Sequence, residues 1–193
     1  LDYRYGILDK ARQRAKTMSL EGALFPWRAI SGEECSAYYP AGTAQYHIDA
    51  DILYAVEKFL AATGEEAPLP FVEMAIESAR MWLSLGCYID GEFCINEVTG
   101  PDEYTACVNN NAYTNLMAQN NLKFAIEVVE TYLKKNRMLP LVLEDDEIAS
   151  WKQAQKAMRI PFDKKLGIYA QDDSFLRKAE WPFATTPKDK HPL

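Results

Sequence analysis

The sequence has few of the residues that build metal centres and disulfide scaffolds. Its 193 residues include two histidines and four cysteines, and no two cysteines are separated by only two residues. A zinc site needs closely spaced Cys and His ligands, so no metal site is expected. A chain of this length does not need disulfides to hold its core. The sequence therefore predicts four reduced thiols, mostly buried: Cys35, Cys87, Cys94 and Cys107.

The sequence also lacks long apolar runs and clusters of basic residues. It contains no run of about 18 apolar residues of the kind that crosses a membrane. Its first residues do not follow the charged, apolar and small-residue pattern of a secretion signal. Acidic residues outnumber basic ones by 28 to 21, which gives a formal net charge of −7. Nucleic acid and membranes are therefore not expected as partners, and a cytoplasmic location is favoured.

Regularly spaced apolar residues predict a mostly helical chain. Stripes at helical spacing indicate helices over 2–18, 44–63, 68–86, 112–135 and 144–158. An Asp-Gly pair between two short β-prone runs predicts one small hairpin within 88–98, and residues 161–183 are expected to be irregular. Short connections alternate with long ones, which is typical of helical hairpins stacked side by side. We predict an all-α fold with the long loops at one edge.

Several catalytic motifs are absent. There is no Gly-rich phosphate loop, HExxH or GxSxG sequence. The chain does contain carboxylic acids close to aromatic residues, which favours carbohydrate chemistry catalysed by a carboxylic acid. In GALFPWRAISGEE, at 22–34, exposed Phe25 and Trp27 beside Arg28 resemble a platform on which a sugar ring stacks. The alternative is that both aromatic residues pack against helix ends.

Two adjacent acids lie in the loop VTGPDEYT at 98–105. Gly100 and Pro101 force a turn, after which the side chains of Asp102 and Glu103 are expected to point apart. One of them can then face a cleft while the other braces the loop. An acid enclosed by aromatic walls is suited to general acid catalysis. The alternative is a pair of solvated turn residues.

The segment GTAQYHIDAD, at 42–51, places His47 and Asp51 four residues apart, on one face at the start of a helix. A hydrogen bond from His47 to a ligand and a satisfied core histidine both remain open. The segment YAQDDSF at 169–175 has a similar polar and aromatic composition.

Taken together, four segments resemble glycoside hydrolase family 65, the inverting disaccharide phosphorylases. They are GALFPWRAISGEE, AQYHIDADI, VTGPDEYTACVNNNAYTN and YAQDDSF, and they occur in the order found in the family. The compact loop CSAYYPAGTAQYH is most similar to the maltose phosphorylase branch. Kojibiose- and trehalose-type members tend to carry a longer loop there, and usually Glu where Arg28 follows FPW.

The resemblance implies an (α/α)6 barrel and a reaction in which phosphate cleaves an α-glucosidic disaccharide, of the maltose type, to β-glucose 1-phosphate and glucose. It implies that Glu103 is the general acid and that Trp27 and Arg28 line the glucose subsite. His47 and Asp102 are expected to support the substrate. Inorganic phosphate is the co-substrate, and no cofactor is implied.

The resemblance also implies that residues 1–193 are the N-terminal half of the barrel, without the β-sandwich domain and the phosphate-binding half. The isolated chain is then expected to be inactive and to form homo-oligomers. One alternative is a hydrolase of trehalose- or kojibiose-type substrates, with Glu97 or Asp172 as the base. Another is a non-catalytic carbohydrate-binding module.

Overall fold

The computed structural model describes residues 1–37, 41–103 and 105–191, and this part of the chain is predominantly helical. The helices are α1 (Asp2–Gly6), α2 (Leu8–Thr17), α3 (His47–Thr63), α4 (Leu69–Leu85), α5 (Ala112–Lys134) and α6 (Glu147–Ala157). The strands are β1 (Cys87–Ile89), β2 (Glu92–Cys94), β3 (Phe162–Asp163) and β4 (Ile168–Tyr169), and short 3-10 turns span Phe175–Arg177 and Lys188–Lys190. The predicted all-α class is confirmed.

The structure differs from the sequence prediction at several places. The helix expected over 2–18 is two helices, because the backbone leaves helical geometry at the buried Ile7 (φ −105°, ψ 11°). The helix expected from residue 44 begins at His47, since the Ala44 carbonyl instead accepts a hydrogen bond from the Thr99 amide. The hairpin predicted within 88–98 is present as β1 and β2, but residues 161–183 are not wholly irregular, because β3 and β4 form a second antiparallel hairpin there.

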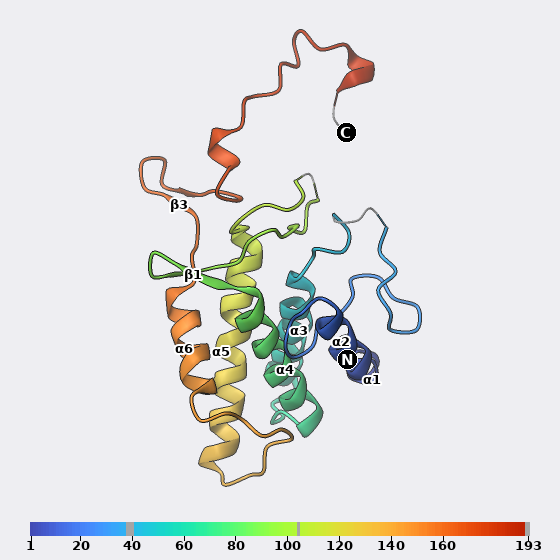
Figure 1. The fold of residues 1–193 in the computed structure, drawn as a ribbon, viewed down its shortest axis with the longest axis vertical. Helices are drawn as coiled ribbons and strands as arrows, with labels where there is room; N and C mark the ends of the chain where they lie inside the picture. Colours follow the sequence, from blue (N-terminus) through green and yellow to red (C-terminus); the bar gives the residue numbers. More distant parts are fainter. Residues whose placement is uncertain (38–40, 104, 192–193) are drawn as a thin grey trace.

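Helix α5 is the centre of the fold and packs against α3, α4 and α6 (Figure 1). Asn111 precedes it and accepts a hydrogen bond from the Thr114 amide at 3.0 Å, which satisfies a free N–H of the first turn. Its buried residues include Leu122, Ala125 and Val129. The apolar faces of α3, α4 and α6 therefore pack against α5.

Helices α3 to α6 form a helical layer, and the segments that join helices are shorter at one end of this layer than at the other. At one end, a short turn that includes Gly64 joins α3 to α4, and the 135–146 segment joins α5 to α6 (Figure 1). Residues 18–37, 41–46, 86–103 and 105–111, which belong to the longer connections, lie toward the opposite end together with the β3–β4 hairpin. The N-termini of α3 and α5 also lie there, as the alternation of short and long connections predicts. In the described residues, no helix is long and apolar enough to cross a membrane.

Candidate functional site

The two adjacent acids of the 98–105 loop contact different parts of the chain. The Glu103 carboxylate accepts a hydrogen bond from Nε2 of Gln45, which lies just before α3. The Asp102 carboxylate accepts one from Nε2 of Gln171, which follows β4. The side chains therefore point apart, as predicted. Both acids are exposed, so the expected enclosure of Glu103 by aromatic walls is not present in the described residues, which leave out Tyr104.

The backbone is strained at four positions in this loop and its flanks, residues 97–103 and 105–110, which together are called the strained loop. Four residues other than glycine, Glu97, Glu103, Cys107 and Asn110, have φ between 52° and 56°. Such left-handed conformations are costly for residues with a Cβ and are found where the surrounding structure holds them, often at functional sites. Paired hydrogen bonds between Val98 and Val108, at 3.0 and 2.8 Å, close the base of the loop. The fold thus holds Glu103 in an unfavourable backbone conformation at the tip of a closed loop.

The three asparagines after the loop explain how it is held. Oδ1 of Asn110 accepts a hydrogen bond from the Ile95 amide at 3.1 Å, and its Nδ2 donates to Asp173 at 2.7 Å. A Cβ on Gly100 would lie only 2.4 Å from Nδ2 of Asn111, so the loop packs directly on the residue that caps α5. Sequence reasoning noted the asparagine run without assigning it this anchoring role.

His47 is part of a hydrogen-bonded group at the start of α3. Its Nδ1 lies 2.9 Å from Oδ2 of Asp51, whose Oδ1 accepts a hydrogen bond from the Tyr113 hydroxyl at 2.8 Å. The Tyr113 ring also contacts the His47 ring edge-on, with centroids 5.6 Å apart. The Asp51 contact fixes the orientation of the imidazole, and Nε2 is buried without a hydrogen-bond partner in the described residues. The Asp51 contact agrees with the interpretation of a held core histidine, and a hydrogen bond from Nε2 to a ligand stays a prediction.

Buried side-chain atoms without a hydrogen-bond partner gather at this end of the molecule. Native structures leave few such atoms, and each calls for water or a ligand. In the described residues these atoms belong to Glu34, His47, Asp49, Thr99, Thr105 and Asn115. Of these atoms, Oε2 of Glu34 lies 2.8 Å from a guanidinium nitrogen of Arg14 and so has an ionic neighbour. All six come from the long loops or from the first turns of α3 and α5, which marks this end as the place where hydroxyl groups of a ligand or water could bind.

The aromatic platform is smaller than the sequence predicts. Phe25 is fully buried, so its expected exposure was wrong. Its backbone explains why: its amide donates to Oδ1 of Asp49 at 2.8 Å, and its carbonyl accepts from Arg14 at 3.0 Å. Trp27 is partly exposed, and the Arg28 guanidinium lies 4.2 Å from the centre of its ring. Trp27 and Arg28 therefore form one stacked pair, on a segment separate from the Gln45–Glu103 contact.

Asp49 is a buried acid behind this platform. Burial raises its pKa well above the usual value of 3.8, although the hydrogen bond from the Phe25 amide and the charges of Arg14 and Arg4 oppose the rise. The second carboxylate oxygen of Asp49 has no hydrogen-bond partner among the residues that the structure describes. The folded chain consequently binds this proton more tightly than the unfolded chain does.

We expect Asp49→Asn to reduce the loss of stability on going from acid to neutral pH. The unfolded acid ionises from about pH 4 upward, while the folded acid stays protonated until its raised pKa. Over that window the unfolded state releases a proton that the folded state keeps, so stability falls as pH rises. Urea unfolding of both chains from pH 4 to 8 measures the difference. An equal pH dependence in the two chains would show that Asp49 does not titrate in this way.

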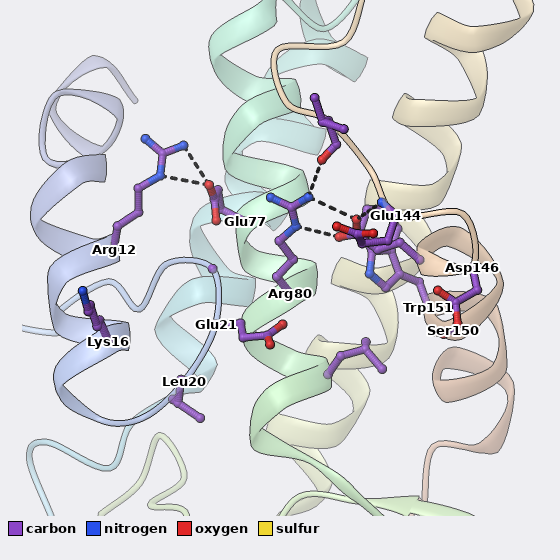
Figure 2. Close-up of a pocket in the computed structure, with 14 residues that line it drawn as sticks. Arg12, Lys16, Leu20, Glu21, Glu77, Arg80, Glu144, Asp146, Ser150 and Trp151 are labelled. Carbon is purple, nitrogen blue, oxygen red and sulfur yellow. Dashed lines mark hydrogen bonds and ion pairs between the residues drawn. The ribbon is translucent and has the colours of Figure 1, made fainter.

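A large groove lies elsewhere. It has a volume of about 840 Å³ and lies between α2, α4 and α6, with its lining arginines already paired: Figure 2 shows Arg12 directed at Glu77, and Arg80 lies 2.6 Å from Glu147. A second cavity, of about 520 Å³, includes Ala44 and Tyr46, the neighbours of Gln45, together with Cys107 of the strained loop. Glu34 also lines this smaller cavity, whereas neither Gln45 nor Glu103 does.

The cysteines are free thiols, and they form no metal site within the described residues. All four thiols are free, but only Cys94 is buried, so the prediction that most are buried was wrong. Cys35 is exposed in the 28–36 loop, and Cys87 is exposed on strand β1. Within the described ranges, no group of three or more His, Cys, Asp or Glu residues is arranged to hold a metal ion.

Comparisons with known proteins agree with the motifs. Residues 1–193 match the sequence profile described as glycosyl hydrolase family 65 central catalytic domain. The chain is 50% identical to an alpha,alpha-trehalose phosphorylase of Geobacillus stearothermophilus, over 100% of this chain and 26% of that protein. It is 32% identical to a kojibiose phosphorylase of Halothermothrix orenii, over 91% of this chain and 26% of that protein. The chain thus spans about a quarter of the length of these relatives.

A solved structure shows the same arrangement of helices. The structure titled putative kojibiose phosphorylase from human microbiome matches 98% of this chain and 29% of its own, with a TM-score of 0.83 and 25% sequence identity. The helical hairpins described above are therefore part of an (α/α)6 barrel, as the sequence predicts.

Proposed function

Because the chain belongs to glycosyl hydrolase family 65, we propose that it carries the catalytic acid of an inverting disaccharide phosphorylase, and that this acid is Glu103. The observation that carries the proposal is the placement of Glu103. Its carboxylate is exposed on a strained loop, at the end of the helical layer where unpaired buried polar atoms gather, and Gln45 holds one of its oxygens.

The proposed reaction needs only one catalytic carboxyl group. Protonated Glu103 gives its proton to the glycosidic oxygen as the bond from that oxygen to the anomeric carbon breaks. An oxygen of phosphate attacks the anomeric carbon from the opposite face, which inverts its configuration and yields β-glucose 1-phosphate. The proton leaves on the new hydroxyl of the released glucose, and Glu103 becomes a carboxylate. Because phosphate is already an anion, no base has to activate it.

The remaining residues have supporting roles in this proposal. Trp27 and Arg28, stacked on each other, line the glucose subsite, while His47 and Asp102 support the substrate. Residues 1–193 form the N-terminal half of the barrel, and the phosphate site and β-sandwich domain lie outside this chain, which by itself is inactive. A cytoplasmic location and a homo-oligomeric enzyme belong to the same proposal.

We infer that the substrate is an α-linked glucose disaccharide. Two kinds of observation support different members of this class. Identities of 50% and 48% to two alpha,alpha-trehalose phosphorylases, against 32% to a kojibiose phosphorylase, support trehalose as the first substrate to test. The compact loop before His47 and the presence of Arg28 support maltose. Residues 38–40 of that loop lie outside the described residues.

The hydrolase alternative has less support. Both oxygens of Asp172 are occupied, one by the Ser174 amide at 2.7 Å and the other by Lys178 at 3.4 Å. Burial opposes ionisation of this acid, but the hydrogen bonds from Ser174 and the Lys178 charge outweigh it and lower the pKa of Asp172. A carboxylate held in this way braces the chain and is poorly placed to activate water.

The proposal is tested on the full-length protein that carries this chain. It is incubated with trehalose, maltose and kojibiose, each with and without inorganic phosphate. We expect one disaccharide to release glucose 1-phosphate, and the rate without phosphate to be lower by at least about 100-fold, since water lacks the charge of phosphate. Equal rates with and without phosphate would indicate a hydrolase. Saturable binding without turnover of any of the three would indicate a binding module.

A further inference from the structure

We propose that Gln45 is the positioning residue of the catalytic acid, selecting which oxygen of Glu103 carries the proton. This inference rests on the proposed role of Glu103. Gln45 lies 58 residues before Glu103 in the chain, and its side chain is the described contact that holds the Glu103 carboxylate.

The environment of Gln45 fixes the direction of its amide. The residue is only 5% exposed, and its Nε2 donates to Oε1 of Glu103 and lies 3.4 Å from the Ala41 carbonyl. A backbone carbonyl can only accept hydrogen bonds, so the nitrogen end of the amide must face this pair of oxygens. If the amide were reversed, its oxygen would face another oxygen at Ala41 and would accept the proton of Glu103 itself.

The backbone on both sides supports this contact. The Thr99 amide donates to the carbonyl of Ala44 at 2.9 Å, which joins the strained loop to the segment that carries Gln45. Glu103 has a φ of 54°, so its position depends on contacts that hold the loop. The buried amide and the backbone bond together fix where the carboxyl group lies relative to the start of α3.

This geometry has a chemical consequence. With Oε1 occupied by the Gln45 N–H, the proton of the neutral acid resides on Oε2, the oxygen left free to face the substrate. When that proton moves to the glycosidic oxygen, negative charge develops on the carboxyl group. The hydrogen bond from Gln45 then becomes one to a charged acceptor, which is stronger than one to a neutral acid. Gln45 therefore favours the transition state over the bound substrate.

The test exploits the basicity of the leaving group. A disaccharide needs a proton on its leaving oxygen, whereas fluoride leaves from α-glucosyl fluoride with little help from an acid. Gln45→Leu removes the donor, and Gln45→Glu keeps the size of the side chain but replaces the donor by an acceptor. Gln119→Leu is the matched control, because Gln119 donates one amide hydrogen bond, at 2.9 Å, to the carbonyl of Gln155, within the helices. All variants are made in the full-length protein, and their folding is checked by thermal unfolding.

We expect both Gln45 variants to lower kcat for phosphorolysis of the disaccharide by about 10- to 100-fold, with Gln45→Glu the more severe. Their kcat with α-glucosyl fluoride and phosphate should change less than about threefold, and Gln119→Leu should resemble the wild type with both substrates. Equal losses on the two substrates, or Gln45 variants that match the control, would overturn the inference. An inactive wild-type protein would instead refute the proposed function, so the two failures are distinguishable.

Discussion

Glu103→Gln is expected to lower kcat for phosphorolysis of the disaccharide by about 10³-fold in the full-length protein. Gln has the size of Glu and can keep the loop in place, but it has no acidic proton to give to the glycosidic oxygen. Binding of the disaccharide, measured by calorimetry, should change little, because the proton moves only in the transition state. Activity on α-glucosyl fluoride should largely persist, because fluoride leaves with little help from an acid.

Glu97→Gln is the matched control for this substitution. Glu97 is exposed, lies on the same loop and has a similar left-handed backbone, with φ 56° against 54° for Glu103. A phosphorylase needs no carboxylate base, so this variant should keep its activity. If Glu97→Gln were as damaging as Glu103→Gln, the hydrolase mechanism with Glu97 as base would be favoured. If neither substitution mattered, the catalytic acid would lie elsewhere.

Trp82→Ala is expected to destabilise the folded chain by about 4 kcal/mol. Trp82 is fully buried in α4, and its indole Nε1 donates to Oδ1 of Asn121 on α5 at 2.9 Å. Asn121 in turn donates to the Ser78 hydroxyl at 3.0 Å. The substitution removes a large apolar group from the α4–α5 contact and also leaves a buried amide oxygen unpaired. Urea unfolding followed by circular dichroism measures the change.

Trp181→Ala provides the control for the loss of a tryptophan. Trp181 is 50% exposed, on the segment that extends away from the helices in Figure 1. Its removal should change the free energy of unfolding by no more than about 0.5 kcal/mol. A loss below about 1 kcal/mol for Trp82→Ala would contradict the packing of α4 against α5.

Much of the helical framework could be predicted from the sequence, because burial against neighbouring helices imposes a regular apolar spacing. Ala75, Ala79 and Trp82 recur at that spacing and all lie in the core. The break at Ile7 was missed because the apolar spacing continues across it, although Gly6, a residue of low helix propensity, comes directly before it. The β3–β4 hairpin was missed since each strand has only two residues, too few to show an alternating pattern.

The site could be predicted only in part. The divergence of Asp102 and Glu103 follows from the local backbone and is present in the structure. The burial of Phe25 depends on Asp49, which is 24 residues away, so the local sequence FPW cannot reveal it. The role of Gln45 could not be predicted for the same reason. Its partner, Glu103, lies 58 residues later in the sequence and is brought close by the tertiary fold. Contacts of this kind follow from the tertiary fold.

The most direct measurement for the central claim is the anomeric configuration of the first product. The full-length protein is incubated with the preferred disaccharide and phosphate, and proton NMR spectra are recorded from the first minutes. A single acid with phosphate attacking from the opposite face predicts β-glucose 1-phosphate from an α-linked substrate. Formation of the α anomer, or of free glucose alone, would contradict the account.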